Sequence, residues 1–175
     1  MPDAPEIYCK SLPIKDLKKA YKLNKQYIEE EESFRQFKKR YKNKKFLFTA
    51  CYRNETLIGL AHGKIMGDYV ILTGIAVLVE FWRKGYGTTL LRFFEEQVKT
   101  CHGLGRISVG CAADVRTESF YLKNGYEPVS LLVWDNDWNK MHVECSTYDP
   151  GIREKVKKER GAAAVNFVFD KMIDP

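Results

Sequence analysis

A strand-like run, a glycine-rich turn and an amphipathic stretch follow one another within residues 74–99, and this succession constrains the fold more than any other feature. Ile75, Val77 and Val79 alternate with other residues, which predicts a strand. Gly85 and Gly87 then interrupt the pattern. From residue 88 onwards, apolar residues recur at helical spacing. The sequence therefore predicts a buried strand that leads through a short turn directly into a helix.

This turn is suited to binding phosphate. The first amides of a helix have no internal acceptor, and the helix dipole places partial positive charge there. Glycines allow an anion to approach the main chain closely, and Arg83 and Lys84 add positive charge. Neither a P-loop nor a dinucleotide fingerprint fits, since the latter needs a third glycine where Leu90 stands. A tight turn with solvated basic side chains remains an equal alternative on these residues alone.

Composition limits the classes of protein to consider. The chain has 175 residues with a net charge of +6, and its pI of about 9.0 favours anionic partners. No apolar run approaches the ~20 residues that span a bilayer, so no membrane partner is expected. Residues 1–6 lack the pattern of a signal peptide. Five cysteines without a C-x-x-C pair predict reduced thiols, a cytoplasmic location and no metal site.

The other elements are predicted from periodicity and turn chemistry, and residues 1–175 are expected to form one domain. Helices are expected at 14–28, 33–41, 115–124 and 149–160, the second with a capping box from Ser33 to Gln36. Strands are expected at 7–10, 46–52, 56–65, 69–79, 107–111, 128–134, 141–145 and 163–173. Four glutamates, Glu29–Glu32, stand between the first two helices. They either complement a helix dipole or attract a cationic ligand.

A second motif follows the predicted turn. The run Ser119-Phe120-Tyr121-Leu122-Lys123-Asn124-Gly125-Tyr126 lies in the helix at 115–124 and the residues just after it. Together with Val77-x-Val79-x-x-Trp82-Arg83-Lys84-Gly85-Tyr86-Gly87-Thr88, it resembles the two signatures of the GNAT superfamily of N-acetyltransferases. The resemblance covers roughly residues 5–145. Trp82 departs from it, because the family usually has Arg or Gln there.

The resemblance implies an α/β (α+β) fold in which helices flank a central mixed, mostly antiparallel sheet of about six or seven strands. Two splayed parallel strands, 69–79 and 106–113, would form the cleft for acetyl-CoA. Pantetheine would bind the main chain of Val77 and Val79. The diphosphate would lie on the turn formed by Arg83, Lys84, Gly85, Tyr86, Gly87 and Thr88.

The same resemblance assigns two further residues. Tyr121 is implied as the acid that protonates the departing thiolate, and Asp114 stands near the pantetheine arm, although it serves equally well as a helix cap. No general base is assigned among His62, His142, Glu80 and Glu144. Cys111 is conceivable as a nucleophile, but direct attack by the amine in a ternary complex suits the family better.

The implied activity is transfer of the acetyl group of acetyl-CoA to a primary amine, on a small molecule or a protein. One alternative is a non-catalytic module of the same fold that binds CoA as a sensor or scaffold. Another is a basic nucleic-acid-binding domain, which is disfavoured because no recognised binding motif accompanies the charge. A homodimer is left open. Residues 147–175 are expected to add a helix and a final strand outside the pattern of the family.

Overall fold

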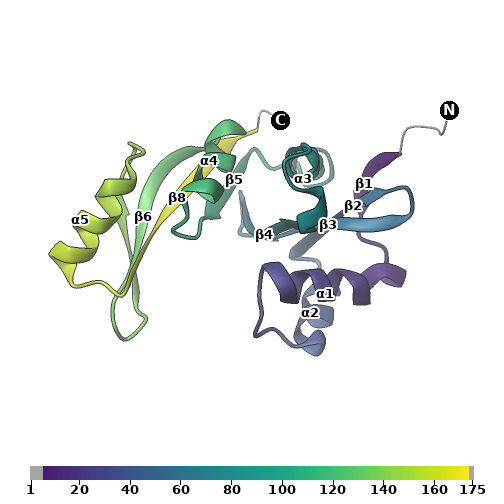
Figure 1. Ribbon diagram of the computed structural model, residues 1–175, viewed down its shortest axis with the longest axis horizontal. Coiled ribbons are helices and arrows are strands. Elements are labelled where there is room, and N and C mark those ends of the chain that lie inside the picture. The colour runs from purple at the N-terminus through teal and green to yellow at the C-terminus, as the bar shows by residue number, and fades with distance from the viewer. Residues whose placement is uncertain (1–5, 174–175) are drawn as a thin grey trace. The chain divides into compact units, whose positions relative to one another are not determined.

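The computed structural model describes residues 6–173, and these divide into two compact units. The first comprises the described residues up to Gly105 together with Ile173, and the second comprises Arg106–Met172 (Figure 1). That residues 1–6 form no signal peptide stays a prediction, because residues 1–5 lie outside the described part. No helix within the described residues is long and apolar enough to cross a membrane.

The first unit is a four-stranded antiparallel sheet with helices on both faces. Its elements are β1 (Ile7–Ser11), the 3₁₀ helix η1 (Ile14–Asp16), α1 (Leu17–Tyr27), α2 (Phe34–Tyr41), β2 (Phe46–Arg53), β3 (Thr56–Ile65), β4 (Val70–Val77), the 3₁₀ helix η2 (Val79–Phe81) and α3 (Tyr86–His102). The strands pair in the order β1-β2-β3-β4. In Figure 1, α3 lies on one side of this sheet, and α1 and α2 lie on the other.

Glycines in the strands let the helices approach the sheet. A Cβ placed on Gly63 would come within 2.7 Å of the Phe94 ring of α3. A Cβ on Gly74 would come within 2.5 Å of Ile28, which directly follows α1. Larger residues would overlap these side chains, which are packed at the density of a protein core. The two glycines therefore allow the helices on the two faces of the sheet to pack closely.

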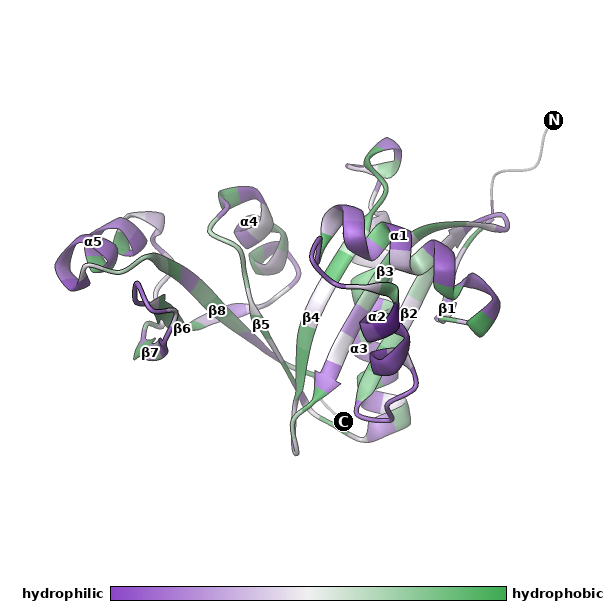
Figure 2. Ribbon diagram, turned by 90° about the horizontal axis from the view of Figure 1, so that it is seen from below, coloured by the Kyte–Doolittle hydropathy of each residue, from purple (hydrophilic) through white to green (hydrophobic). Residues whose placement is uncertain are grey.

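The second unit is also an antiparallel sheet, but its last strand in sequence lies between earlier ones. Its elements are β5 (Arg106–Gly110), α4 (Val115–Lys123), β6 (Glu127–Trp134), β7 (Lys140–Glu144), α5 (Pro150–Arg160) and β8 (Ala164–Met172). β8 pairs with β5 on one side and with β6 on the other, and β7 pairs with β6. Residues 164–172 are thus a central strand of this unit. α5, which lies between β7 and β8 in the sequence, is largely hydrophilic (Figure 2).

Most predicted elements are confirmed. Ser33 and Gln36 form the expected capping box. The alternation of Val165, Phe167 and Phe169 does mark a strand, and all three side chains are buried. The class, a mixed α/β fold with mostly antiparallel strands and flanking helices, is confirmed too, with eight strands within residues 6–173. That strands 69–79 and 106–113 splay apart stays a prediction.

The strand predicted over 69–79 extends too far. β4 ends at Val77, and Val79 begins the short helix η2 with about half of its surface exposed. The prediction that Val79 belongs to the strand is therefore wrong. A hydrophobic alternation cannot distinguish a strand from a 3₁₀ turn over three residues, because the two differ mainly in main-chain hydrogen bonds.

Candidate functional site

The turn before α3 has the main-chain conformation that an anion site requires. Gly85 is the N-cap of α3 with φ 83°, in the left-handed region, and no side chain caps the helix. The helical hydrogen bonds begin where the amide of Thr89 donates to the carbonyl of Gly85 at 3.0 Å. The amides of Tyr86, Gly87 and Thr88 therefore have no acceptor within the helix. Three adjacent N–H groups at the positive end of a 17-residue helix favour an anion.

Basic side chains from the turn and from β2 lie close to the aromatic ring of Phe81. The Lys84 ammonium lies 5.6 Å from the centre of the Phe81 ring and donates to the carbonyl of Glu80 at 2.9 Å. The Arg53 guanidinium, from the end of β2, lies 5.7 Å from the same ring. Arg53 belongs to neither sequence motif. Together with Arg83, which is itself in the left-handed region at φ 58°, these residues make the surroundings of the turn positive.

Trp82, the residue that departs from the family pattern, contacts the end of β4. Its indole N–H donates to the carbonyl of Val77 at 2.6 Å, although about half of the side chain is exposed. This hydrogen bond joins the residue that follows η2 to the last residue of β4. It therefore holds together the two ends of the segment between β4 and the turn. The main chain of Val77 is expected from sequence to bind pantetheine, and its carbonyl is already an acceptor within the chain.

The first unit also holds a cavity of about 600 Å³ on the side of α1 and α2. It is lined by residues of both charges and by two polar residues of the sheet, namely Glu29, Glu31, Glu32, Lys39, Arg40, His62 and Thr73. On β4, Thr73 is an extra residue in the pairing with β3, because His62 is opposite Gly74 and Gly63 is opposite Leu72. This bulge directs the Thr73 hydroxyl to within 2.7 Å of His62 Nδ1.

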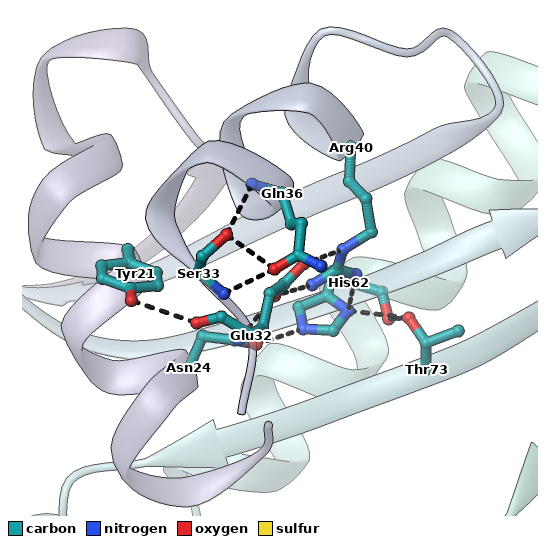
Figure 3. Close-up of polar contacts among 8 residues, drawn as sticks. All are labelled: Tyr21, Asn24, Glu32, Ser33, Gln36, Arg40, His62 and Thr73. Carbon is teal, nitrogen blue, oxygen red and sulfur yellow. Dashed lines mark hydrogen bonds and ion pairs between the residues drawn. The ribbon is translucent and has the colours of Figure 1, made fainter. Parts of the chain in front are cut away.

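His62 lies in a hydrogen-bond network that fixes its state (Figure 3). The Asn24 amide nitrogen donates to Glu32 at 3.0 Å, so its carbonyl oxygen faces His62 Nε2 at 2.7 Å. Nε2 therefore carries the ring proton, and Nδ1 is an acceptor. Burial and the nearby Arg40 guanidinium lower the pKa of His62 to about 3. At neutral pH, His62 is thus an uncharged structural group, which argues against a general-base role.

The glutamate run divides into one buried residue and three more exposed ones. Glu32 is 9% exposed. Its carboxylate accepts from Arg40 Nε at 2.7 Å, and its main-chain carbonyl accepts from the Tyr21 hydroxyl at 3.0 Å. Glu32 therefore ties the segment between α1 and α2 to both helices. Sequence reasoning did not detect this role, because the partners of Glu32 come from two different helices, α1 and α2.

We expect His62 to make the stability of the fold depend on pH. Its folded-state pKa of about 3 lies below the ordinary value of 6.5, so between these values the unfolded chain binds the extra proton. The stabilisation is complete above pH 6.5 and is lost as the pH falls. Urea unfolding measures the free energy of unfolding of the wild type and of His62→Gln. The difference in favour of the wild type should be about 2 kcal/mol smaller at pH 5 than at pH 7.

The exposed His102 provides the control for this experiment. The difference between wild type and His102→Gln is measured over the same range, because this substitution removes an imidazole that is not buried. A constant difference between wild type and His62→Gln from pH 7 to pH 5 would contradict the assigned neutral state.

In the second unit, Tyr121 is buried on α4, with 4% of its surface exposed. Its ring contacts the rings of Tyr126 and Phe169, at centroid distances of 5.5 and 6.3 Å. Burial and the nearby Cys111 raise the pKa of the Tyr121 hydroxyl well above its usual value. The hydroxyl is therefore protonated at neutral pH, as a proton donor must be.

Asp114 and Cys111 have structural surroundings in the same unit. Asp114 is the N-cap of α4 and accepts from the amide of Thr117 at 3.0 Å, and hydrogen bonds from Thr117 lower its pKa. The predicted capping role is confirmed, and a contact with pantetheine stays a prediction. Burial raises the pKa of Cys111 to about 12. Its thiol is therefore a poor nucleophile at neutral pH.

A metal site is not found among the described residues, since no group of three or more His, Cys, Asp or Glu side chains is placed to hold an ion.

Several solved structures with the same fold are acetyltransferases. The ribosomal-protein-S18-alanine N-acetyltransferase from Escherichia coli matches with a TM-score of 0.70 at 16% identity, over 97% of this chain and 96% of that one. An aminoglycoside 6′-acetyltransferase type Ii matches at 0.69 and 18% identity, over 96% and 98%. A PaiA N-acetyltransferase from Thermoplasma acidophilum, in complex with coenzyme A, matches at 0.60 and 20% identity, over 95% and 99%.

The fold is thus that of N-acetyltransferases. The model of the acetyltransferase (GNAT) family matches residues 14–126, which span β4, the glycine turn, α3 and α4. The chain belongs to this family of transferases, as the two sequence motifs predicted. No curated protein gives a significant match to the sequence.

Proposed function

We propose that this protein transfers the acetyl group of acetyl-CoA to a primary amine. The observation that carries the proposal is the α3 N-terminus, where a left-handed Gly85 and three amides without helical acceptors form an anion site in a GNAT chain. The diphosphate of acetyl-CoA is the anion we assign to it. A cytoplasmic location belongs to the same proposal, and it is supported by five cysteines that are all free thiols.

The turn binds the diphosphate mainly through its main chain. The amides of Tyr86, Gly87 and Thr88 donate to phosphate oxygens, and the cations beside Phe81 add long-range attraction. Side chains at Arg83, Lys84 and Tyr86 should therefore tolerate substitution better than the glycines. A main-chain amide near Val77 is proposed to polarise the thioester carbonyl as an oxyanion donor.

Acetyl transfer requires an uncharged amine. Its nitrogen lone pair attacks the thioester carbonyl carbon, the carbon–sulfur bond breaks, and the sulfur leaves as a thiolate. The attacking nitrogen loses a proton to water, and the thiolate gains one from the Tyr121 hydroxyl, whose raised pKa keeps it protonated before the reaction. Water then returns a proton to the Tyr121 oxygen. Direct attack is preferred to an acetyl-cysteine route, because the thiol of Cys111 is buried and hard to ionise.

The activity is tested with a panel of amines, in which release of free CoA is monitored. The acceptors named for similar folds define the panel, namely a peptide with an N-terminal alanine, spermidine and an aminoglycoside, with free lysine added. Turnover of one class establishes the enzyme and its acceptor type. Saturable binding of acetyl-CoA without turnover of any member would favour the alternative of a non-catalytic CoA-binding module.

Tyr121→Phe is expected to lower kcat about 10²-fold on the best acceptor, while the affinity for acetyl-CoA changes less than twofold. The ring would still pack against Phe169, and only the proton donor would be lost. Tyr126→Phe is the matched control, because Tyr126 is equally buried and its ring contacts Tyr121. An unchanged kcat in Tyr121→Phe would remove the acid role.

A further inference from the structure

Cys9 and Cys51 lie directly opposite each other on two neighbouring antiparallel strands of the first unit. Cys9 belongs to β1 and Cys51 to β2, and the register of the two strands pairs them. The amide of Leu12 donates to the carbonyl of Phe48 at 2.9 Å, so these two residues form a hydrogen-bonded pair. Hydrogen-bonded and non-hydrogen-bonded pairs alternate along such a ladder. Cys9 and Cys51, three positions further along, are therefore a non-hydrogen-bonded pair, in which side chains approach most closely.

The spacing of the strands at such a pair fits a disulfide. The Cα atoms of a non-hydrogen-bonded pair are about 4.5 Å apart, within the range of roughly 4.4–6.8 Å that disulfides span. Residues directly opposite each other point to the same face of a sheet, so both thiols lie on one face. The Cys9 thiol donates a hydrogen bond to the sulfur of Cys51. The two cysteines therefore already lie in the arrangement that a disulfide requires.

The pair faces α3, and its two thiols differ in their access to solvent. Ala50 and Tyr52, on either side of Cys51 in β2, belong to the core beside α1 and α2. Because side chains alternate along a strand, Cys51 points to the other face, which α3 covers (Figure 1). Cys51 is completely buried there, whereas Cys9 is partly exposed. A small oxidant from solvent therefore meets Cys9 first.

The hydrogen bond between the thiols also favours the reactive form of Cys51. Donation by Cys9 lowers the pKa of the Cys51 thiol. The buried Cys111 shows the opposite behaviour, since burial raises its pKa. Thiolate is the nucleophilic form of cysteine. Cys51 is thus suited both to accept the proton of Cys9 and to attack its sulfur, which a buried thiol without a partner is not.

We propose that Cys9 and Cys51 form an oxidation site, at which a hydroperoxide produces a reversible disulfide between β1 and β2. The Cys9 sulfur attacks the outer peroxide oxygen, the oxygen–oxygen bond breaks, and Cys9 becomes a sulfenic acid. The Cys9 proton passes through the Cys51 sulfur to the departing oxygen, which leaves as water or an alcohol. Cys51 then attacks the Cys9 sulfur, the sulfur–oxygen bond breaks, and hydroxide leaves with the Cys51 proton as water. Two electrons pass from the two sulfurs to the peroxide, and acetyl transfer is not involved.

Peptide mapping of the full chain tests this site. The native protein is treated with hydrogen peroxide, remaining thiols are alkylated, and the digest is analysed by mass spectrometry. Linked peptides that contain Cys9 and Cys51, lighter by two hydrogen atoms than the separate peptides, should appear at least about threefold faster than oxidised Cys101. Cys101 is the exposed thiol, so exposure alone would favour its oxidation instead. Dithiothreitol should restore both thiols of the pair.

Two variants and a matched control complete the test. In Cys51→Ala, Cys9 should oxidise no faster than Cys101 and should proceed to sulfinic acid, which dithiothreitol does not reduce. Cys9→Ala, at the partly exposed position, repeats the test without disturbing the core, and Cys51 should then stay reduced. Cys111→Ala also removes a buried thiol, and the linked peptides should form within about twofold of the wild-type rate. Oxidation of Cys101 ahead of the pair, or linkage only after unfolding in urea, would overturn the proposal.

Discussion

Gly85→Glu should abolish the rise in melting temperature that acetyl-CoA gives the wild-type protein, with an affinity about 10²-fold lower, or about 2.7 kcal/mol. Two effects act together. A side chain at φ 83° strains the left-handed N-cap of α3, and the new carboxylate lies where the diphosphate is proposed to bind. The measurement is a thermal-shift titration with acetyl-CoA, confirmed by calorimetry.

Gly103→Glu is the control that separates backbone strain in α3 from the loss of acetyl-CoA binding. Gly103 is the C-cap of the same helix, with φ 61°, and a Cβ there would meet no atom within 4 Å, as at Gly85. Both variants should lose about 1–2 kcal/mol of stability without ligand, because each forces a residue with a side chain into the left-handed region. The ligand-induced shift should persist in Gly103→Glu. Equal affinities for acetyl-CoA in both variants would exclude the α3 N-terminus as the diphosphate site.

The turn could be predicted from the sequence because its signals are local. A glycine that must adopt positive φ, a change of period from strand to helix and adjacent basic residues all lie within residues 74–99. The capping roles of Ser33 and Asp114 are local in the same sense, since each accepts from an amide three residues later. Signals of this kind need no knowledge of the tertiary fold.

The roles of His62 and Trp82 could not be predicted in this way. The buried state of His62 depends on Asn24, which is 38 residues away, and on a bulge at Thr73. The bond from Trp82 to the Val77 carbonyl depends on a 3₁₀ turn that a hydrophobic alternation does not reveal. Both roles depend on the geometry of hydrogen bonds in the folded chain. Residue types alone do not determine that geometry.

The residues that line the cavity beside α1 and α2 limit how strongly Glu29–Glu32 can attract a cationic acceptor. Glu32 is already paired with Arg40, so it is not available as an anion for an incoming cation. Glu29 and Glu31 line the cavity, but Lys39 and Arg40 do so as well. The lining therefore has mixed charge, and the run of four glutamates overstates its negative character. Acceptor choice has to be measured with the panel rather than inferred from these side chains.

The C-terminal segment shows the same contrast between local and distant signals. The period of two at residues 165–169 was enough to predict β8, but not its position between β5 and β6. Likewise, a helix could be predicted at 149–160, but not that one of its cations is buried. Arg153 is 9% exposed and forms an ion pair with Glu118 of α4, whose side chain is fully buried.

Arg153→Met should lower the free energy of unfolding by about 3–5 kcal/mol, because it leaves the Glu118 carboxylate buried without its cation. Arg153 Nε lies 3.1 Å from Glu118 Oε1, and the Tyr148 hydroxyl donates to Oε2 at 2.7 Å. Burial and this hydrogen bond raise the pKa of Tyr148 to about 12, so it remains a neutral donor that cannot replace the guanidinium. Urea unfolding measures the loss, and the melting temperature should fall by roughly 10 °C.

Lys155→Met is the matched control on the same helix. Lys155 pairs with Glu159 at 4.0 Å, with both side chains more than half exposed, and its loss should cost less than about 0.5 kcal/mol. Glu118→Gln in the Arg153→Met background should recover part of the lost stability, because the neutral amide is less costly to bury without a cation than a carboxylate. If Arg153→Met and Lys155→Met proved equally mild, the ion pair would not be what holds α5 against α4. A large loss in Arg153→Met alone, partly recovered by Glu118→Gln, would establish that α5 is anchored to α4 through this buried charge pair.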